Sequence, residues 1–335
     1  MLGVTKERAQ ETSDMERVLR TNVTEFVLLG FSDLSQSLQA VLFTFLLSAY
    51  LLTLFGNGLI LFTVTLDRGL HTPMYFFLRN LSFIELFFTT VTIPKVLSDF
   101  RSQKRSISFY GCATQMFVFF AVGVTECVFL AVMAFDRYMA ICRPLRYLSV
   151  MSRKLCYKLT VGSWLTGLLV SLGQTTFIFT LPYCASNHLE HFFCDIPPLL
   201  SVACSNTFIN QLSVFMACLT GATIPFVLIL CSYVRILSSI TLIRSAEGRH
   251  KALSTCGSHL ASVILFYGTA MFMYLRLGSR RPTGNDRPIT LFYCMVIPAI
   301  NPLIYSLRNK DMKRALVKLV VKPLGGNEGF RLDKI

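Results

Sequence analysis

A few ionisable residues and one cysteine on a long apolar stretch are the first candidates for chemistry. Met116 to Arg137 is apolar for about 20 residues, enough for a helix to cross the ~30 Å hydrocarbon core of a bilayer. Glu126 lies near its middle, Asp136-Arg137-Tyr138 closes it, and Cys112 precedes it. An acid at mid-membrane costs free energy, so it almost always faces a protein interior and has a function. This helix therefore connects one membrane surface with the other.

The acid and arginine at the end of this stretch have two interpretations. Asp136 and Arg137 could form a two-state switch, in which an interfacial ion pair breaks on activation. The alternative is a static ion pair that only anchors the end of the helix. The residues alone do not decide between the two.

Other polar side chains lie inside other apolar runs, namely Asn57, Glu85 and Asn301. Groups at this depth must satisfy one another or a bound ion. Together with Glu126, they could hold a cation, share a proton between the two acids, or form a purely structural hydrogen-bond network.

The composition indicates a membrane protein. Of the 335 residues, 53% are hydrophobic and only 15% are charged, and the mean hydropathy is +0.56. A soluble domain of this length carries far more charge. The net charge of +14 is spread over short segments between apolar runs. This pattern favours loops that face anionic lipid and a protein partner, and it argues against nucleic-acid binding.

The chain has 11 cysteines. Cys112, Cys184, Cys194 and Cys204 fall in or beside loops, where an oxidising compartment would allow them to pair in any of three ways. No pair has the C-x-x-C spacing of a zinc site. His188 and His191 lie near Cys194 and could bind a metal, although ordinary loop residues are the simpler interpretation.

Seven apolar runs are each long enough to span a membrane, which predicts an all-α membrane protein with seven transmembrane helices. Strands of a β-barrel would alternate over ~10 residues, and these runs do not. Prolines inside the fifth and seventh runs are tolerated in membrane helices that neighbours pack against. The runs are Ala40–Leu66, Pro73–Leu97, Met116–Arg137, Leu159–Leu181, Leu212–Val234, Ala252–Leu275 and Ile289–Leu307.

The regions outside these runs predict the topology. Residues 1–36 are expected to be an extracellular tail without a signal peptide, and Asn22 begins a glycosylation sequon in it. With the N-terminus outside, 20 of the 32 Lys and Arg residues fall on inner segments, a diluted positive-inside bias. The predicted domains are thus the tail, the bundle over 37–307, and a cytoplasmic segment over 308–335. That last segment begins with a short amphipathic helix with apolar Met312, Leu316, Leu319 and Val320.

Five motifs in order resemble those of rhodopsin-like G-protein-coupled receptors, and specifically of odorant receptors. They are LHTPMYFFL from Leu70, MAFDRYMAIC from Met133, Ser232-Tyr233, KALSTCGSHL from Lys251 and PAINPLIYSLRN from Pro298. The resemblance covers roughly Asn22 to Val320. It implies an odorant pocket in the outer half of a plasma-membrane bundle. It also implies a cytoplasmic face that activates a stimulatory olfactory-type G protein and raises cyclic AMP. The first 14 residues exceed the usual tail of the family, so Met15 is an alternative start.

The resemblance also implies roles for residues. In the inactive state Asp136 would hold Arg137, which is followed by Tyr138. In the active state Tyr233 and Tyr305 would meet Arg137, with the Asn301-Pro302 kink as a hinge; a fixed bend is the alternative. Glu85 and Glu126 would form an internal cation site with sodium as the ion, and no other cofactor is expected. The implied disulfides are Cys112–Cys194 and Cys184–Cys204.

The same resemblance implies an apolar ligand pocket, in which two tyrosine hydroxyls and thiols are the polar groups. Such a lining suits a small, largely hydrophobic volatile. Phe119 stands where amine receptors carry Asp, which argues against a cationic amine ligand. Tyr267 and Thr269 replace the usual Trp and Pro of helix six. The pocket residues are Phe119, Phe120, Gly123, Val124, Ala217, Cys218, Gly221, Tyr267, Ala270, Met271, Tyr274, Leu291 and Cys294.

The competing class is a transporter or channel that uses the intramembrane acids. Transporters tend to show repeated halves and broken midplane helices, and the sequence has no internal repeat. An enzyme is a weaker option, because neither H-E-x-x-H nor G-x-S-x-G occurs. The sequence names neither the odorant nor any oligomeric state.

Overall fold

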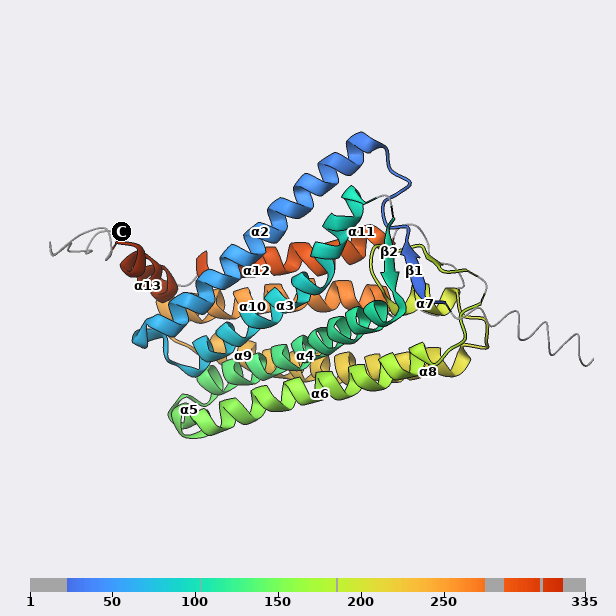
Figure 1. Cartoon of the computed structure of the whole chain (residues 1–335). Coiled ribbons are helices and arrows are strands. Elements are labelled where there is room, and N and C mark those ends of the chain that lie inside the picture. Colours follow the sequence, from blue (N-terminus) through green and yellow to red (C-terminus); the bar gives the residue numbers. More distant parts are fainter. Residues whose placement is uncertain (1–22, 103, 185, 275–285, 308–309, 322–335) are drawn as a thin grey trace, which may run out of the picture.

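The computed structural model describes residues 23–102, 104–184, 186–274, 286–307 and 310–321, which form a bundle of long helices (Figure 1). Tyr274 keeps its place in a helix, but its side chain lies outside the description, as do Met15 and Asn22. The first three long helices match the predicted runs and extend them, and the fourth begins six residues earlier and ends two residues earlier than its run. They are α2 (Gln36–Leu66), α3 (Pro73–Arg101), α4 (Phe109–Cys142) and α6 (Arg153–Phe179).

The fifth and seventh membrane helices each contain a π-helical turn. The fifth consists of α8 (Phe208–Cys218), the turn η2 (Leu219–Thr223) and α9 (Ile224–Thr241). The seventh consists of α11 (Asp286–Leu291), η4 (Phe292–Val296) and α12 (Ile297–Leu307). Pro225 and Pro298 follow these turns closely. Because proline lacks an N–H and crowds the preceding turn, a wider turn there relieves the helix.

The sixth membrane helix is α10 (Ala246–Tyr274). Six helical segments in the described ranges are long and apolar enough to cross a membrane, and α10 is not one of them. The stretch from Lys251 to Leu260, KALSTCGSHL, lowers its hydropathy. Its polar Ser258, His259 and Ser262 are buried and therefore face the bundle, not lipid.

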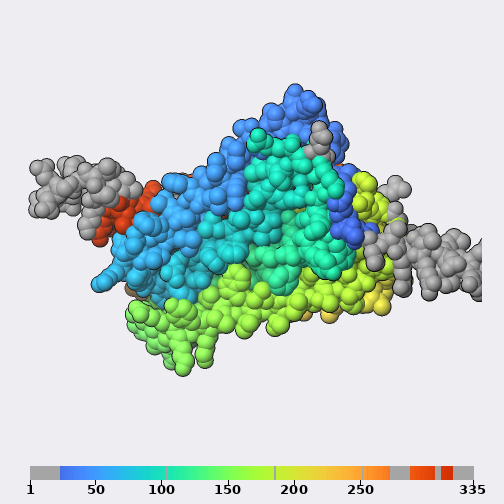
Figure 2. Space-filling view, viewed as in Figure 1, coloured from blue at the N-terminus to red at the C-terminus, as the bar shows by residue number. Residues whose placement is uncertain are grey.

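Helix α4 is the centre of the bundle and packs against α3, α6 and α9. On the face shown in Figure 2, the surface is formed by α2, α3 and the α5–α6 segment, where α5 spans Pro144–Val150. Many apolar side chains of α2 and α6 are exposed, as expected for helices that face lipid. Helices α4 and α6 are in close contact at Gly167, where an added Cβ would collide with Thr125 and the Ala121 carbonyl.

A three-stranded sheet lies at one end of the bundle, which we call the sheet end; the opposite end is the Arg137 end (Figure 1). The central strand β1 (Glu25–Leu28) pairs antiparallel with β2 (Ser106–Ser108) and parallel with β3 (His188–Leu189). Phe26 and Leu28 of β1 point into the core and are buried. The expectation of a plain tail over residues 1–36 therefore missed an ordered strand, because four residues give too short a pattern.

Both disulfides implied by the resemblance are present at the sheet end. Cys112 of α4 is bonded to Cys194 with their Cα atoms 5.4 Å apart, and Cys184 is bonded to Cys204 with a Cα separation of 6.0 Å. The first bond ties the segment after β3 to the start of α4. The short helix α7 (Ile196–Ser201) follows directly, and most of its side chains are buried.

The predicted amphipathic helix is α13 (Lys310–Val321), at the Arg137 end. Met312 and Ala315 are buried, while Lys313, Arg314 and Lys318 are exposed. Its apolar face packs against α2 and α12. The helix therefore docks on the bundle in addition to presenting a basic surface.

The glycines of α6 allow a direct test of the α4–α6 contact. Gly167→Ala should lower the unfolding midpoint of the detergent-purified protein by several degrees, since overpacking a tight contact costs about 1–3 kcal/mol. Gly162→Ala and Gly173→Ala are matched controls on the same helix, because an added Cβ at either meets nothing within 4 Å. Equal thermal shifts for all three variants would contradict this packing.

Candidate functional site

A cavity of about 80 Å³ lies among α4, α6, α7, the α8–η2 segment, α10 and η4, in the half of the bundle nearer the sheet end. Its walls are mostly apolar, and its polar groups come from Gln174, Thr223, Tyr293 and two thiols. The lining residues are Phe119, Phe120, Gly123, Val124, Cys127, Val170, Gln174, Ile196, Val214, Ala217, Cys218, Gly221, Ala222, Thr223, Ala270, Met271 and Tyr293.

Nine of the thirteen residues predicted for the pocket line this cavity. Tyr267 does not line it: the ring is buried, and its hydroxyl donates to the Cys127 carbonyl at 2.8 Å. Leu291 and Cys294 are buried elsewhere in the seventh helix. The side chain of Tyr274 lies outside the described residues.

The cavity also contains residues that the sequence did not indicate. Ala222 and Thr223 follow the predicted Gly221, and all three residues line the cavity because the π turn η2 changes the direction of successive residues. Ile196 follows Cys194 by two residues, so the Cys112–Cys194 disulfide holds it at the cavity. Gln174 comes from α6 and is held by Ser213, whose carbonyl accepts from its Nε2 at 3.2 Å. Only Tyr293 had a sequence signal, as an aromatic in the seventh run.

The size of the cavity restricts what can bind. Ligand sites for drug-sized molecules usually measure about 300–1,000 Å³. A cavity of about 80 Å³ is smaller, so it suits a molecule of few heavy atoms or must widen around a larger one. Its few polar groups could orient such a molecule but could not neutralise a charge, because no Asp or Glu lines it.

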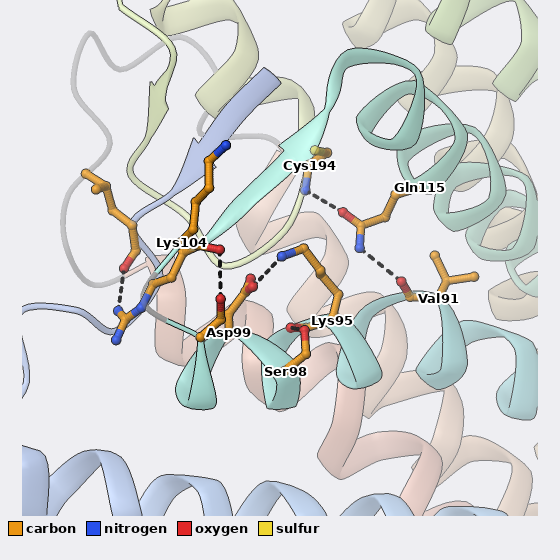
Figure 3. Close-up of polar contacts among 10 residues, drawn as sticks. Val91, Lys95, Ser98, Asp99, Lys104, Gln115 and Cys194 are labelled. Carbon is orange, nitrogen blue, oxygen red and sulfur yellow. Dashed lines mark hydrogen bonds and ion pairs between the residues drawn. The ribbon is translucent and has the colours of Figure 1, made fainter. Parts of the chain in front are cut away.

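The segment after β3 closes the sheet end above the cavity. Gln115 of α4 is its main polar support: its Oε1 accepts from the Cys194 N–H at 3.0 Å, and its Nε2 donates to the Val91 carbonyl at 3.0 Å (Figure 3). Phe193 packs on Phe119 with ring centroids 4.7 Å apart. The same segment therefore contacts a cavity residue through Phe193.

Arg287, at the start of α11, connects this segment with the N-terminal residues. Its Nη1 lies 2.9 Å from Asp33, and its Nε donates to the Glu190 carbonyl at 3.2 Å. The backbone N–H of Gly30 donates to the His191 carbonyl at 3.0 Å. Gly30 has a φ of 49° and lies against Phe192, so a side chain there would be strained. These contacts hold the N-terminal segment on the sheet end.

His191 and His188 do not converge as a metal site would require. His188 is exposed on β3, whereas His191 is buried and stacks on Phe192 with centroids 4.5 Å apart. The sulfur of Cys194 is used in the disulfide. Burial, and the nearby Arg287 charge to a lesser extent, lower the pKa of His191 to about 3. The ring is therefore neutral at pH 7.

A chain of polar contacts crosses the middle of the bundle. Asn301 donates to the carboxylate of Glu85, and its Oδ1 accepts from the Ser262 hydroxyl at 2.7 Å. Asn57 donates to the Pro298 carbonyl at 3.2 Å. Glu126 is buried and accepts no hydrogen bond from the described residues. Two buried carboxylates with amide and hydroxyl oxygens nearby are donors that suit a hard cation such as sodium.

The Asp136–Arg137 pair differs from the expected arrangement. Asp136 accepts from the Tyr147 hydroxyl of α5 at 2.9 Å, while Arg137 Nη1 contacts the Met74 sulfur at 2.8 Å. Asp136 and Arg137 are not within salt-bridge distance of each other, so the ion pair that the resemblance implies is absent in this structure. Burial and the Asp136 charge raise the pKa of Tyr147, which keeps its hydroxyl protonated as a donor.

The tyrosines predicted to meet Arg137 have other surroundings here. The Tyr233 hydroxyl lies 2.8 Å from His259 Nδ1, and His259 Nε2 lies 3.2 Å from the Leu130 carbonyl. This contact links α9, α10 and α4. Tyr305 is buried in α12, and Tyr138 is half-buried on α4. His259 is a residue of this network that the sequence left without a role.

The fold is a seven-helix bundle of the rhodopsin type. Squid rhodopsin superposes with a TM-score of 0.68 at 19% identity, and the match covers 87% of each chain. At that identity the likeness concerns the fold alone.

The family is shown by sequence. A profile described as olfactory receptor matches residues 46–323. Human olfactory receptor 10AG1 is 47% identical over 90% of this chain and 99% of its own length, and human olfactory receptor 10C1 is 49% identical over 90% and 96%. Mouse olfactory receptor 5AR1 is 48% identical over 92% and 99%. The chain therefore belongs to the olfactory receptor family. It is a multi-pass plasma-membrane receptor and not an enzyme, and a small-molecule ligand and G-protein coupling are general properties of its family.

The neutral, buried His191 predicts a pH-dependent stability. An unfolded histidine takes up a proton as the pH falls through about 6.5, whereas His191 in the folded protein does not until about 3. The folded state should therefore lose up to about 1.4 kcal/mol per pH unit below pH 6. Unfolding midpoints between pH 7 and 5 should fall less steeply in His191→Asn than in wild type.

The exposed His188 provides the control for that measurement. His188→Asn should leave the slope of midpoint against pH as it is in wild type. If His191→Asn has the same slope of unfolding midpoint against pH as wild type, then His191 is not buried as a neutral ring in the folded protein.

Proposed function

We propose that this receptor binds a small, largely hydrophobic volatile in the cavity and activates a stimulatory olfactory-type G protein, which raises cyclic AMP. The observation that carries the ligand class is the cavity lining, which is apolar apart from an amide, two hydroxyls and thiols. Uncharged volatiles fit such a lining, because a charged ligand would find no counter-charge there.

The orientation that we propose places the sheet end outside the cell. Its two disulfides need an oxidising environment, and the sequon at Asn22 precedes the sheet by a few residues. The Arg137 end then faces the cytoplasm with the basic helix α13 at the inner membrane surface. We also propose that Asn22 is glycosylated and that residues 1–36, 37–307 and 308–335 are the outer, membrane and inner parts.

The surface proposed to receive the G protein lies at the Arg137 end. Leu145 of α5, between Arg143 and Arg146, is 100% exposed, and Leu148, two residues after Arg146, is 79% exposed. Apolar side chains so exposed on a short helix favour a protein partner. Tyr147 of the same helix holds Asp136, so docking at α5 can be coupled to Arg137 through that contact.

The proposed mechanism is a shift of population between two packings. The odorant binds the active packing better and moves the equilibrium by its differential affinity. Arg137 would leave Met74, whose sulfur is a weak acceptor, and meet the G protein. Tyr233, Tyr305 and the Asn301-Pro302 bend would rearrange with it. Glu85 and Glu126 would hold a sodium ion, or share a proton, in the inactive packing.

A reporter-cell assay with a panel of volatiles tests the function. A hit should raise cyclic AMP in cells that carry the receptor. Arg137→Ala should remove this response at equal surface expression, because the switch residue is lost. If no volatile acts, or if the response survives Arg137→Ala, the proposed function is wrong.

The cavity is tested with the same assay and the same hit. At Gly123, an added Cβ lies 3.5 Å from Phe88 and 3.6 Å from the Tyr293 hydroxyl, so Gly123→Leu fills the cavity without a backbone collision. The concentration for half-maximal response should rise by about tenfold or more. Gly162→Leu, which faces open space, is the control and should respond like wild type. Equal responses of both variants would place the ligand elsewhere.

A further inference from the structure

A second cavity, larger than the first, lies at the Arg137 end. Its volume is about 250 Å³, and it is formed where the α2–α3 connection meets α3 and the start of α6. Figure 2 shows these segments on the same face of the molecule. The lining residues are Val64, Leu70, His71, Thr72, Pro73, Phe76, Arg79, Met151, Arg153, Cys156 and Tyr157.

The polar part of this cavity is cationic. Arg79 and Arg153 line it together with His71, and no Asp or Glu does. Neither arginine has a hydrogen bond or an ion pair with any of the described residues. Arg79 is the stronger evidence for a bound anion, because it is half-buried and lies inside the membrane helix α3. An arginine at this depth is retained only where it has a partner or reaches the interface.

Two helices also begin at this cavity. Pro73 is the first residue of α3, and Thr72 before it makes no side-chain capping bond; Arg153 is the first residue of α6. The N–H groups of a helix start carry a partial positive charge, which adds to that of the arginines. The site therefore combines two guanidinium groups with two positive helix ends.

The remaining wall is largely apolar and partly exposed. Phe76 and Tyr157 meet edge to face with centroids 5.1 Å apart, and Tyr157 is 58% exposed. Arg79 is six residues beyond the start of α3, about 9 Å along the helix axis. The cavity thus places two arginines beside an apolar, partly exposed wall, so a ligand here would have an anionic head and an apolar tail.

We propose that this cavity binds the phosphate headgroup of an anionic phospholipid from the cytoplasmic leaflet. Arg79 and Arg153 would contact the phosphate, and the acyl chains would run past Phe76 and Tyr157. Basic pockets between membrane helices on the cytoplasmic side recognise lipid headgroups through this combination of groups. The choice of the cytoplasmic leaflet depends on the orientation proposed above.

The position of the site connects it with the Arg137 switch. Pro73 lines the cavity, and the next residue, Met74, is the contact of Arg137. On the other wall Met151 is bonded through its backbone N–H to the carbonyl of Tyr147, the residue that holds Asp136. A bound headgroup would therefore stabilise the segments that hold both members of the pair, and its loss would change basal signalling.

Photocrosslinking tests the binding without odorant or G protein, so its failure is separate from a failure of the proposed function. The full receptor is reconstituted in phosphatidylcholine vesicles with a trace of phosphatidic acid that carries a diazirine on the acyl chain near the glycerol. Adducts should concentrate in residues 70–79 and 151–157. The same diazirine on phosphatidylcholine should label these segments far less.

Single substitutions locate the contact. Arg79→Gln and Arg153→Gln should each reduce the labelling by phosphatidic acid about fivefold. Lys154→Gln is the matched control, because Lys154 is adjacent to Arg153 but does not line the cavity. If Arg79→Gln does not fold, Arg153→Gln alone tests the contact with the phosphate. Arg153 is exposed, so its loss leaves the packing intact.

Three outcomes would overturn the proposal. The first is labelling of these segments that both arginine variants leave unchanged. The second is an equal loss in Lys154→Gln, which would reveal unspecific attraction to a basic surface. The third is displacement of the labelled lipid by millimolar inorganic phosphate, which would show that the site takes free phosphate and not a lipid.

Discussion

Polar groups inside a membrane bundle must find partners in the protein, and this requirement organises the whole molecule. Asn301 connects Glu85 with Ser262, so one amide joins α12, α3 and α10. Asn57 adds α2 through the Pro298 carbonyl. Helices α2, α3, α10 and α12 are thus joined by a few hydrogen bonds in the middle of the bundle. Loss of any member would leave a buried polar atom without a partner.

The same requirement explains the two π turns. Pro225 and Pro298 each remove an N–H that the preceding turn would need, and each follows a wider turn. In the fifth helix the wide turn directs three successive residues at the cavity. In the seventh helix Pro302 has no N–H to donate to the Pro298 carbonyl four residues before it, and this carbonyl accepts from Asn57 instead. The prolines thereby contribute to the shape of the cavity and to a contact between helices.

Much of the fold could be predicted from sequence, because apolar length and a few motifs define it. The seven runs, the final amphipathic helix and both disulfides were expected and are present. The pocket was predicted less completely: residues on α4 were found, since position relative to Cys112 defines them, whereas Gln174 and Thr223 were not. Their places depend on the α6–α8 contact and on the π turn, and neither has a period that a sequence reveals.

At the Arg137 end the structure shows contacts that the resemblance did not imply. Asp136 is bonded to Tyr147 and Arg137 touches Met74, because α5 and the start of α3 lie closer to these side chains than the sequence could indicate. At the opposite end, the ordered strand β1 was missed altogether. Four residues carry little pattern, and the strand exists only through partners that are distant in sequence.

The central position of β1 has a consequence for biosynthesis. This strand is translated first, yet its neighbours β2 and β3 follow about 80 and 160 residues later, behind two and four membrane helices. Four of the membrane helices must therefore be synthesised before β1 can pair with both β2 and β3. Until β2 and β3 have been made, the backbone N–H and C=O groups of β1 have no strand partners.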